Sequence, residues 1–198
     1  VLWRPTPEQL TEWLQQPSPF WSYDVETDGI EPLKCKLRTI AISIPDLDHR
    51  GRTARESIEQ NARAVGIGLL STDGLTRLYP PEQEQKIIEI LKHVFTDGRV
   101  WLGHNAGYYD RMVIETQLGV TPSPLVDTLF HARFRTPDLP KGLKTIGSIL
   151  TDVERWETTE KGDSIATGTT DDDELLRYNI IDTVVNARIV VPLMKAAD

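Results

Sequence analysis

The sequence predicts an α/β fold with a mixed central β-sheet flanked by α-helices, and two observations lead to that prediction. Three β-rich runs lie within the first 71 residues, whereas short strands and helical patterns alternate after residue 80. Strands that come first and strand–helix alternation that follows favour a mixed sheet with helices packed on its faces. A chain of 198 residues can bury a substantial core, so we expect a single domain over residues 1–198.

The N-terminal part of the chain supplies one helix and the three β-rich runs. Pro7 to Leu14 has the pattern of a short amphipathic helix, with Thr6 as its cap. Strands are then predicted for Phe20–Glu26, Leu37–Ile44 and Ala64–Ser71, the last continuing past an Asp73-Gly74 turn into Leu78-Tyr79. The glycines of Gly66-Ile67-Gly68 are interpreted as sheet packing, since no third glycine completes a dinucleotide-binding loop.

Helices alternate with short strands in the remainder of the chain. Pro81 begins a helix that carries one apolar stripe. Short buried strands are predicted at Val100–Leu102 and Leu125-Val126. Further helices are predicted for Ala106–Leu118, Thr128–Phe134 with Asp127 as its cap, Leu143–Leu150, and Asp172 to about Ala197 with an interruption at Pro192.

Two polar segments have no clear secondary structure. Asp46–Arg63 carries four arginines, and Trp156–Thr170 is rich in threonine, glycine and charge. Both are interpreted as solvated loops. A second interpretation, in which the arginines contact a phosphate backbone, is left open by the sequence.

Composition limits the classes of function. The net charge is −8, and residues 151–182 alone, with ten acids and three basic residues, contribute −7 of it. The chain therefore has no broad basic face, although metal-binding carboxylates are compatible with a nucleic-acid partner. No apolar run approaches the roughly 20 residues that span a bilayer, so no membrane partner is expected. A single cysteine, Cys35, fits a reducing, intracellular compartment, and we expect a cytoplasmic location.

Asp24 and Glu26 lie one residue apart at the end of an apolar strand. Alternation along a strand places both on one face, roughly 6.5–7 Å apart. Two like charges there repel, and a divalent cation is the natural group to hold them. The pattern is weak by itself, because it recurs at Asp152–Glu154 and Asp172–Glu174. If the pair stood alone, two carboxylates that leave a strand into solvent would be the better interpretation.

Two later motifs supply further acids. The segment Asn105–Asp110 follows a short apolar strand and begins a helix, and open sheets bind ligands at such strand ends. Asp110 could also simply complement the helix dipole. Tyr178 and Asp182 share one face of an apolar helix, where an aspartate is unusual without a partner. The other interpretation is a Tyr–Asp pair on the polar side of that helix.

In order and spacing these residues resemble the three motifs of the DEDD superfamily of 3′–5′ exonucleases: Asp-x-Glu, Asn-x₂₋₃-(Phe/Tyr)-Asp and Tyr-x₃-Asp. The tyrosine of the third motif is typical of the DEDDy group. Val126–Leu129 and Thr136–Leu143 resemble the proofreading domains of family A, particularly phage-type, DNA polymerases. The resemblance spans Tyr23 to Pro192, while Asp46–Arg63 has no dependable counterpart.

The resemblance implies a ribonuclease H-like fold and release of nucleoside monophosphates from the 3′ end of DNA with two divalent cations, Mg²⁺ or Mn²⁺. It implies that Asp24 bridges both ions and that Glu26 and Asp182 complete the site that activates water. Asp110 would hold the second ion, largely through water. Tyr178 would orient the attacking water, because a phenol of pKa near 10 is a poor base at neutral pH.

The resemblance also implies contacts with a single-stranded or frayed 3′ end. Asn105 would hydrogen-bond near the terminal nucleotides, and the backbone of Thr27 would meet the 3′ hydroxyl. Ile30 would either wedge against the terminal bases or belong to the core of the next turn. His104 is interpreted as a local structural contact.

Three questions about the role of the chain stay open at this point. An RNA-trimming exonuclease resembling ribonuclease D is an alternative to the DNA enzyme. A catalytically silent module of a polymerase is a second alternative, which the presence of all four acids disfavours. The C-terminal helical run suggests that a covalently linked polymerase domain follows, in a bacterial or phage-infected cell.

Overall fold

A six-stranded sheet forms the centre of the protein, in a computed structural model that describes residues 1–45, 63–151, 153, 156 and 169–194. The strand order is β1-β4-β3-β2-β5-β6. β3 pairs antiparallel with β2 and β4, whereas the β1–β4, β2–β5 and β5–β6 pairs are parallel. The strands are β1 (Leu2–Trp3), β2 (Trp21–Thr27), β3 (Leu37–Ser43), β4 (Ala64–Gly68), β5 (Trp101–Gly103) and β6 (Leu125–Asp127). The expected mixed sheet is confirmed.

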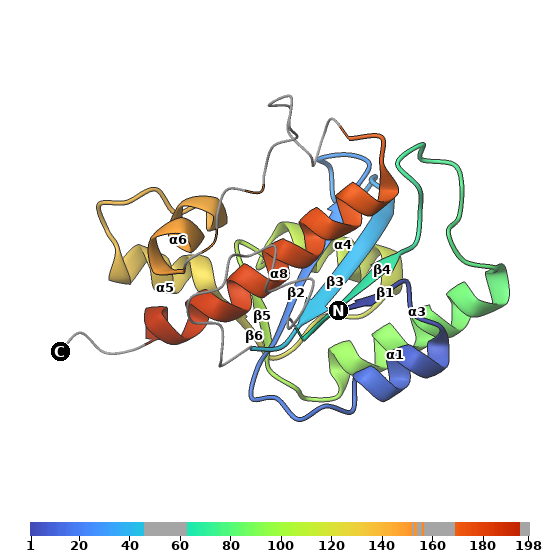
Figure 1. Cartoon of the computed structure of the whole chain (residues 1–198), viewed down its shortest axis with the longest axis horizontal. Coiled ribbons are helices and arrows are strands. Elements are labelled where there is room, and N and C mark those ends of the chain that lie inside the picture. The colour runs from blue at the N-terminus through green and yellow to red at the C-terminus, as the bar shows by residue number, and fades with distance from the viewer. Residues whose placement is uncertain (46–62, 152, 154–155, 157–168, 195–198) are drawn as a thin grey trace.

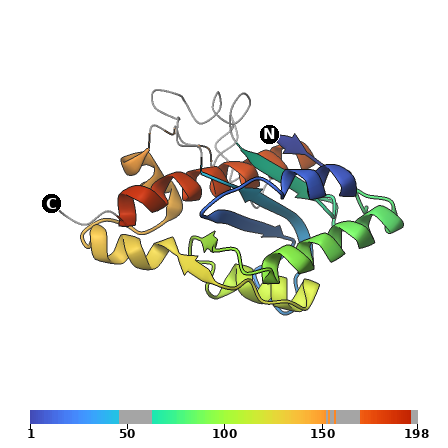
Figure 2. The same cartoon turned by 90° about the horizontal axis from the view of Figure 1, so that it is seen from below.

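Helices cover both faces of this sheet. The longest, α8 (Asp172–Met194), crosses one face over β2, β3 and β4, and α3 and α4 lie on the other side (Figures 1 and 2). α5 and α6 lie together beyond β6, near the C-terminal half of α8 (Figure 1). The remaining bounds are α1 (Pro7–Trp13), α3 (Pro81–Thr96), α4 (Tyr109–Leu118), α5 (Thr128–Arg135) and α6 (Leu143–Leu150). Among the described residues, none of these helices could cross a bilayer.

β2 separates an aromatic core from a polar seam. Tyr23 faces the α3 side, where its ring centroid lies 5.3 Å from that of Phe95 and 5.7 Å from that of Trp101. On the opposite face, Ser22 accepts a hydrogen bond from Asn186 of α8 at 3.0 Å. The period of two residues in a strand therefore directs one set of side chains into the core and the other toward α8.

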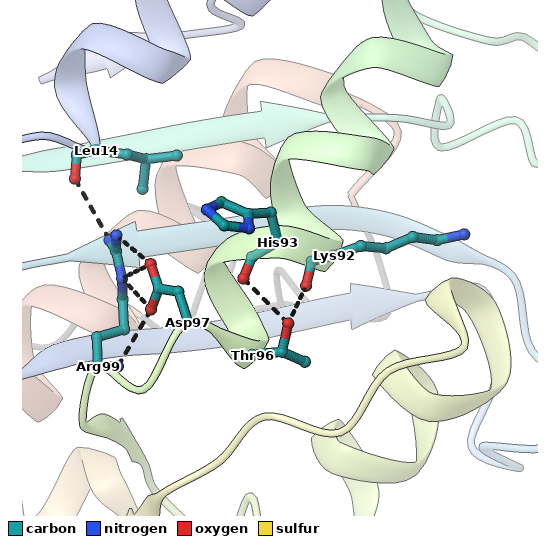
Figure 3. Close-up of polar contacts among 6 residues, drawn as sticks. All are labelled: Leu14, Lys92, His93, Thr96, Asp97 and Arg99. Carbon is teal, nitrogen blue, oxygen red and sulfur yellow. Dashed lines mark hydrogen bonds and ion pairs between the residues drawn. The ribbon is translucent and has the colours of Figure 1, made fainter.

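The turn between α3 and β5 is fixed by Arg99 (Figure 3). Its guanidinium forms an ion pair with Asp97 at 2.7 Å, donates to the Leu14 carbonyl at 3.4 Å, and lies 4.2 Å from the ring centroid of Trp21. The hydroxyl of Thr96 donates to backbone carbonyls in the last turn of α3. These contacts connect α1, α3 and β2 at the end of the sheet opposite the acidic motifs.

Several predicted boundaries differ from the structure for identifiable reasons. β4 ends at Gly68 and not at Ser71, because the N–H groups of Leu69 and Leu70 both donate to the Arg38 carbonyl and turn the chain across β3. Leu70 forms only an isolated bridge, and Leu78-Tyr79 is not a strand. The two-residue strand β1 was not predicted.

Two helix predictions were also wrong in detail. α4 begins at Tyr109 and not at Ala106, because Asn105 has a φ of 63° and its N–H donates to Asp127. Pro192 does not interrupt α8 but lies inside its last turn. The loop interpretations of Asp46–Arg63 and Trp156–Thr170 fall almost entirely outside the described residues.

Close approach of α8 to β4 depends on Gly66, as the sheet-packing interpretation of this glycine requires. A Cβ at this position would lie 2.6 Å from Cδ1 of Ile180 and 3.0 Å from Cδ1 of Leu176, both fully buried in α8. We predict that Gly66→Ala lowers the free energy of unfolding by about 1–3 kcal/mol, because the added methyl overpacks the helix–sheet interface. Urea denaturation measures the change.

Gly142→Ala is the matched control, because a Cβ there meets nothing within 4 Å and φ is −61°. It should change the free energy of unfolding by less than about 0.5 kcal/mol. Equal effects of the two substitutions would contradict the packing argument.

Candidate active site

The three acidic motifs meet at the C-terminal end of β2. Asp24 and Glu26 come from β2, Asp110 from the first turn of α4, and Tyr178 and Asp182 from the middle of α8. β2 and β5 are parallel neighbours, so the end of β2 and the loop that follows β5 lie at the same edge of the sheet. Segments more than 150 residues apart in sequence thus share one site.

Three of the carboxylates form a compact group. Asp24, Glu26 and Asp182 each place an oxygen so that the three oxygens lie within 4.8 Å of one another. Asp24 and Glu26 are partly buried, and Asp182 is buried. The amide of Asn179, which itself accepts from Thr39, donates to the Asp24 carboxylate at 2.7 Å. Asp24 is therefore oriented by α8 as well as by its own strand.

Asp110 lies beside this group but is not one of its three members. It is buried, and its Oδ1 accepts a hydrogen bond from the Val25 backbone N–H at 3.3 Å. That contact places the Asp110 carboxylate against the backbone of β2, at the residue between Asp24 and Glu26. The charge of Asp110 raises the pKa of Asp24 more than that of any other neighbour, so the two side chains are electrostatically close.

Burial and mutual repulsion make the ionised form of these acids unfavourable. Burial is the main reason that the pKa of Glu26 rises to about 8 and the pKa of Asp110 to about 7. Burial, followed by the charges of Asp110, Asp182 and Glu26, raises the pKa of Asp24 well above its ordinary value. A cluster of this kind is under strain unless positive charge is added.

Lys144 supplies part of that charge, and the sequence did not reveal it. Its ammonium group, from the first turn of α6, donates to both carboxylate oxygens of Asp182. It also lies 4.4 Å from the ring centroid of Tyr178 and 5.0 Å from that of Trp156. Lys144 lowers the pKa of Asp24, Glu26 and Asp182. A lysine in an amphipathic helix carries no local signal of such a role.

Tyr178 and Trp156 border the same carboxylate. Burial and then the charge of Asp182 raise the pKa of Tyr178, which keeps the phenol protonated at neutral pH. The indole N–H of Trp156 donates to Oδ1 of Asp182 at 2.5 Å. Trp156 was not among the predicted site residues. Tyr178, one turn before Asp182 on α8, and Trp156, which lies outside α8, thus both contact the Asp182 carboxylate.

Asp127 organises the loop between β5 and α4. Its carboxylate accepts from the backbone N–H groups of Asn105 at 2.8 Å, of Gly107 at 3.1 Å and of Leu129 at 2.9 Å. The last of these bonds confirms Asp127 as the cap of α5. His104 makes structural contacts, as predicted, but its partners are remote in sequence and not local: the Thr128 hydroxyl at 2.9 Å and the Lys141 carbonyl at 2.7 Å.

The three predicted substrate-contact residues lie at the end of β2, on the turn after it and in the loop after β5. Asn105 is exposed at the start of the loop, and Thr27 follows Glu26 at a β-bulge. The hydroxyl of Tyr109 donates to the Gly29 carbonyl at 2.5 Å and lies 2.6 Å from the Thr27 hydroxyl. These two contacts fix the turn after β2. Ile30 on this turn is 89% exposed, so its alternative interpretation as a core residue is wrong.

The donor set suits hard divalent cations. All ligand atoms are carboxylate oxygens, which Mg²⁺ and Mn²⁺ prefer, and within the described residues the site contains no histidine or cysteine ligand that would favour zinc. The raised pKa values of Asp24, Glu26 and Asp110 also indicate a site that is short of positive charge. The residues therefore fit the expected divalent cations.

Sequence comparison finds no match, either to a protein-family profile or to a curated protein. Comparison of folds does find matches. NrnC from Brucella melitensis superposes with a TM-score of 0.59 at 20% identity, over 89% of this chain and 72% of that chain. Structures of NrnC have also been determined with bound Mg²⁺ and with bound pGG.

Two longer proteins share the same fold. RNase D from Escherichia coli, an exoribonuclease involved in structured RNA processing, gives a TM-score of 0.64 at 17% identity over 98% of this chain and 44% of that chain. A family B DNA polymerase from Pyrobaculum calidifontis gives 0.58 at 14% identity over 88% of this chain and 24% of that chain. The expected fold is thus confirmed, because these solved structures share it over most of this chain.

Repulsion within the cluster leads to a prediction about stability without cations. Asp24→Asn should raise the melting temperature in EDTA by about 2–4 °C, or about 1 kcal/mol, because it removes one repelling carboxylate. The new side-chain carbonyl can still accept from Asn179. Thermal unfolding of both proteins in EDTA measures the difference.

The pH dependence of that difference has a definite sign. Glu26 has a folded pKa of about 8, above its usual value of 4.5, so the folded state binds more protons than the unfolded state between these values. Stability of the cation-free wild type therefore falls as pH rises through this window. The advantage of Asp24→Asn should be largest near pH 8 and vanish near pH 4. A variant that is less stable at every pH would contradict the prediction.

Proposed function

We propose that this chain is a divalent-cation-dependent 3′–5′ exonuclease of the DEDDy type that acts on DNA. The observation that carries the proposal is the convergence of Asp24, Glu26 and Asp182 within 4.8 Å, with Asp110 and Tyr178 beside them. Motifs that match a nuclease family in sequence order need not meet in space. Here they meet at the strand ends where α/β folds place their ligands.

The chemistry assigns a distinct task to each residue. Bound Mg²⁺ or Mn²⁺ would supply charge neutralisation at the phosphoryl group and an activated water. Asp24, Glu26 and Asp182 would hold these ions, and Asp110, on α4, would help to hold the second ion. The protonated phenol of Tyr178 would orient the water by its hydroxyl and not remove a proton, because burial and Asp182 raise its pKa.

The terminal nucleotide would lie against the turn after β2. Thr27 offers backbone groups at the β-bulge, and Ile30 projects into solvent, where it could wedge between terminal bases. Asn105 presents its side chain from the loop before α4, which Asp127 holds in place. These three roles follow from the family resemblance, and the side chains of Ile30 and Asn105 are exposed while that of Thr27 is half-buried.

An RNA-trimming exonuclease is the second candidate function. It is favoured by the fold shared with RNase D over 98% of this chain. The DNA enzyme is favoured by the resemblance of the segments around Asp127 and Pro140 to polymerase proofreading domains. A polymerase domain linked to this chain, and release of nucleoside monophosphates during proofreading, belong to the first candidate.

The first test measures degradation of 5′-labelled single-stranded DNA and RNA of the same sequence with Mg²⁺ or Mn²⁺. We expect a ladder that shortens from the 3′ end of DNA, and a loss of about 10³-fold or more for Asp24→Asn, the scale on which central catalytic groups act. Asp138→Asn, an exposed aspartate outside the site, is the matched control. A strong preference for RNA would select the second candidate, and activity retained by Asp24→Asn would refute the cation site.

Lys144 provides a second test of the site. Lys144→Met keeps the length of the side chain but removes a charge that lowers the pKa of Asp24, Glu26 and Asp182. These pKa values should then rise, so fewer carboxylates are ionised at a given pH. The acid limb of the pH–activity profile should move to higher pH by about one unit.

Lys92→Met, an exposed lysine on α3, serves as the control for this test and should leave the profile in place. A purely structural role of Lys144 would lower the melting temperature without moving the profile. That result would contradict the electrostatic role.

A further inference from the structure

α5 presents an aromatic and basic surface that the proposed chemistry does not use. Phe130 and Phe134 are 55% and 87% exposed, and both lie with Arg133 on the face of α5 opposite the buried Thr128 and Ala132. Spacing of i, i+3 and i+4 puts the three side chains side by side. We call Phe130, Arg133 and Phe134 the α5 stripe. Two adjacent phenylalanines in water are costly unless a partner covers them.

The charge of the stripe opposes that of the whole protein. The chain carries a net charge of −8, yet α5 has Arg133 and Arg135 and no acid. Within the described residues, neither arginine is paired with a carboxylate. The Arg133 guanidinium lies 5.6 Å from the ring centroid of Phe130, which aligns cation and ring on one surface. This combination suits an anionic partner with flat apolar groups.

Lys141, the next cation along the chain, is used in a different way. Its ammonium group donates to the backbone carbonyls of Thr136, Pro137 and Leu139 and closes the loop after α5. The loop is therefore internally fixed, and the free positive charge of this region belongs to the arginines of α5.

The stripe is attached to the active site by short covalent and hydrogen-bonded connections. α5 starts directly after Asp127, which holds the loop of Asn105. Phe134 lies six residues beyond Thr128, or about 9 Å along the helix axis. The next helix, α6, carries Lys144 onto Asp182. A strand whose 3′ end lies at the carboxylates could thus reach α5 within a few nucleotides.

We propose that the α5 stripe binds a single-stranded segment of the nucleic-acid substrate, upstream of the nucleotide in the active site. Bases would stack on Phe130 and Phe134, and phosphates would pair with Arg133. The inference rests on the proposed exonuclease function. It adds a contact upstream of the terminal nucleotide, and this contact would make the protein prefer longer strands.

The test compares short and long single strands, of about 4 and about 15 nucleotides. Binding is measured in EDTA by fluorescence anisotropy, and kcat/KM is measured with Mg²⁺. The double variant Phe130→Ala/Phe134→Ala should weaken binding of the long strand about tenfold and lower its kcat/KM similarly, whereas values for the short strand change less than about twofold. Leu75→Ala, which removes an apolar side chain that is 81% exposed away from α5, should change neither.

Arg133→Gln tests the electrostatic part independently. Loss of one phosphate contact should reduce the slope of log Kd against log salt concentration by about 0.7 for a single strand. A slope equal to that of the wild type would remove Arg133 from the proposal. Arg77→Gln, on the segment between β4 and α3, provides the control for the loss of an arginine.

The outcomes separate this inference from the proposed function. Equal losses on both strand lengths, or no loss on either, would overturn the α5 stripe as a binding surface. A change of oligomeric state in the double variant with unchanged strand binding would also overturn it and assign the surface to contact between copies of the chain. Failure of the wild type to hydrolyse any strand refutes the exonuclease proposal, while the anisotropy comparison still decides the role of the stripe.

Discussion

The structure depends on the polar seam between β2 and α8. Asn186 donates to Ser22, and Asn179 donates to Asp24 while accepting from Thr39. Buried amides of this kind are favourable only when their partners are in place, so they fix both the register and the rotation of α8 on the sheet. The same rotation that satisfies the two asparagines brings Asp182 to Asp24 and Glu26. Packing and the proposed chemistry therefore share one constraint.

That constraint places repelling charges together. The aromatic core on the other face of β2 and the close approach of α8 at Gly66 hold the acids in position although their ionised forms are disfavoured. Lys144 offsets part of this cost at Asp182, and cations would offset the rest. Functional sites commonly contain such unfavourable interactions, because the rest of the fold is stable enough to offset their cost. The α5–α6 region contributes in two ways, through Lys144 at the carboxylates and through the exposed face of α5.

The sequence predicted more of the site than of its surroundings. Asp24 and Glu26 share a face by strand alternation, and Tyr178 and Asp182 share a face by helical spacing. Neither pattern was sufficient alone, and the order and spacing of the three motifs together selected these residues. Lys144 and Trp156 were missed, because their roles arise only where α6 and the Trp156 side chain pack against α8. No pattern within a segment records which remote side chain it will meet.

The sequence by itself determined the mixed α/β class and the order of the acidic motifs, because hydrophobic period and residue spacing are local properties of the chain. Tertiary structure alone decided that three of the acids form one group while Asp110 stands beside it, that α4 starts after Asn105, and that Ile30 is exposed. Each of these outcomes depends on contacts between segments far apart in sequence. Such contacts are set by the packing of α8 and α4 against the sheet, which no single stretch of sequence specifies.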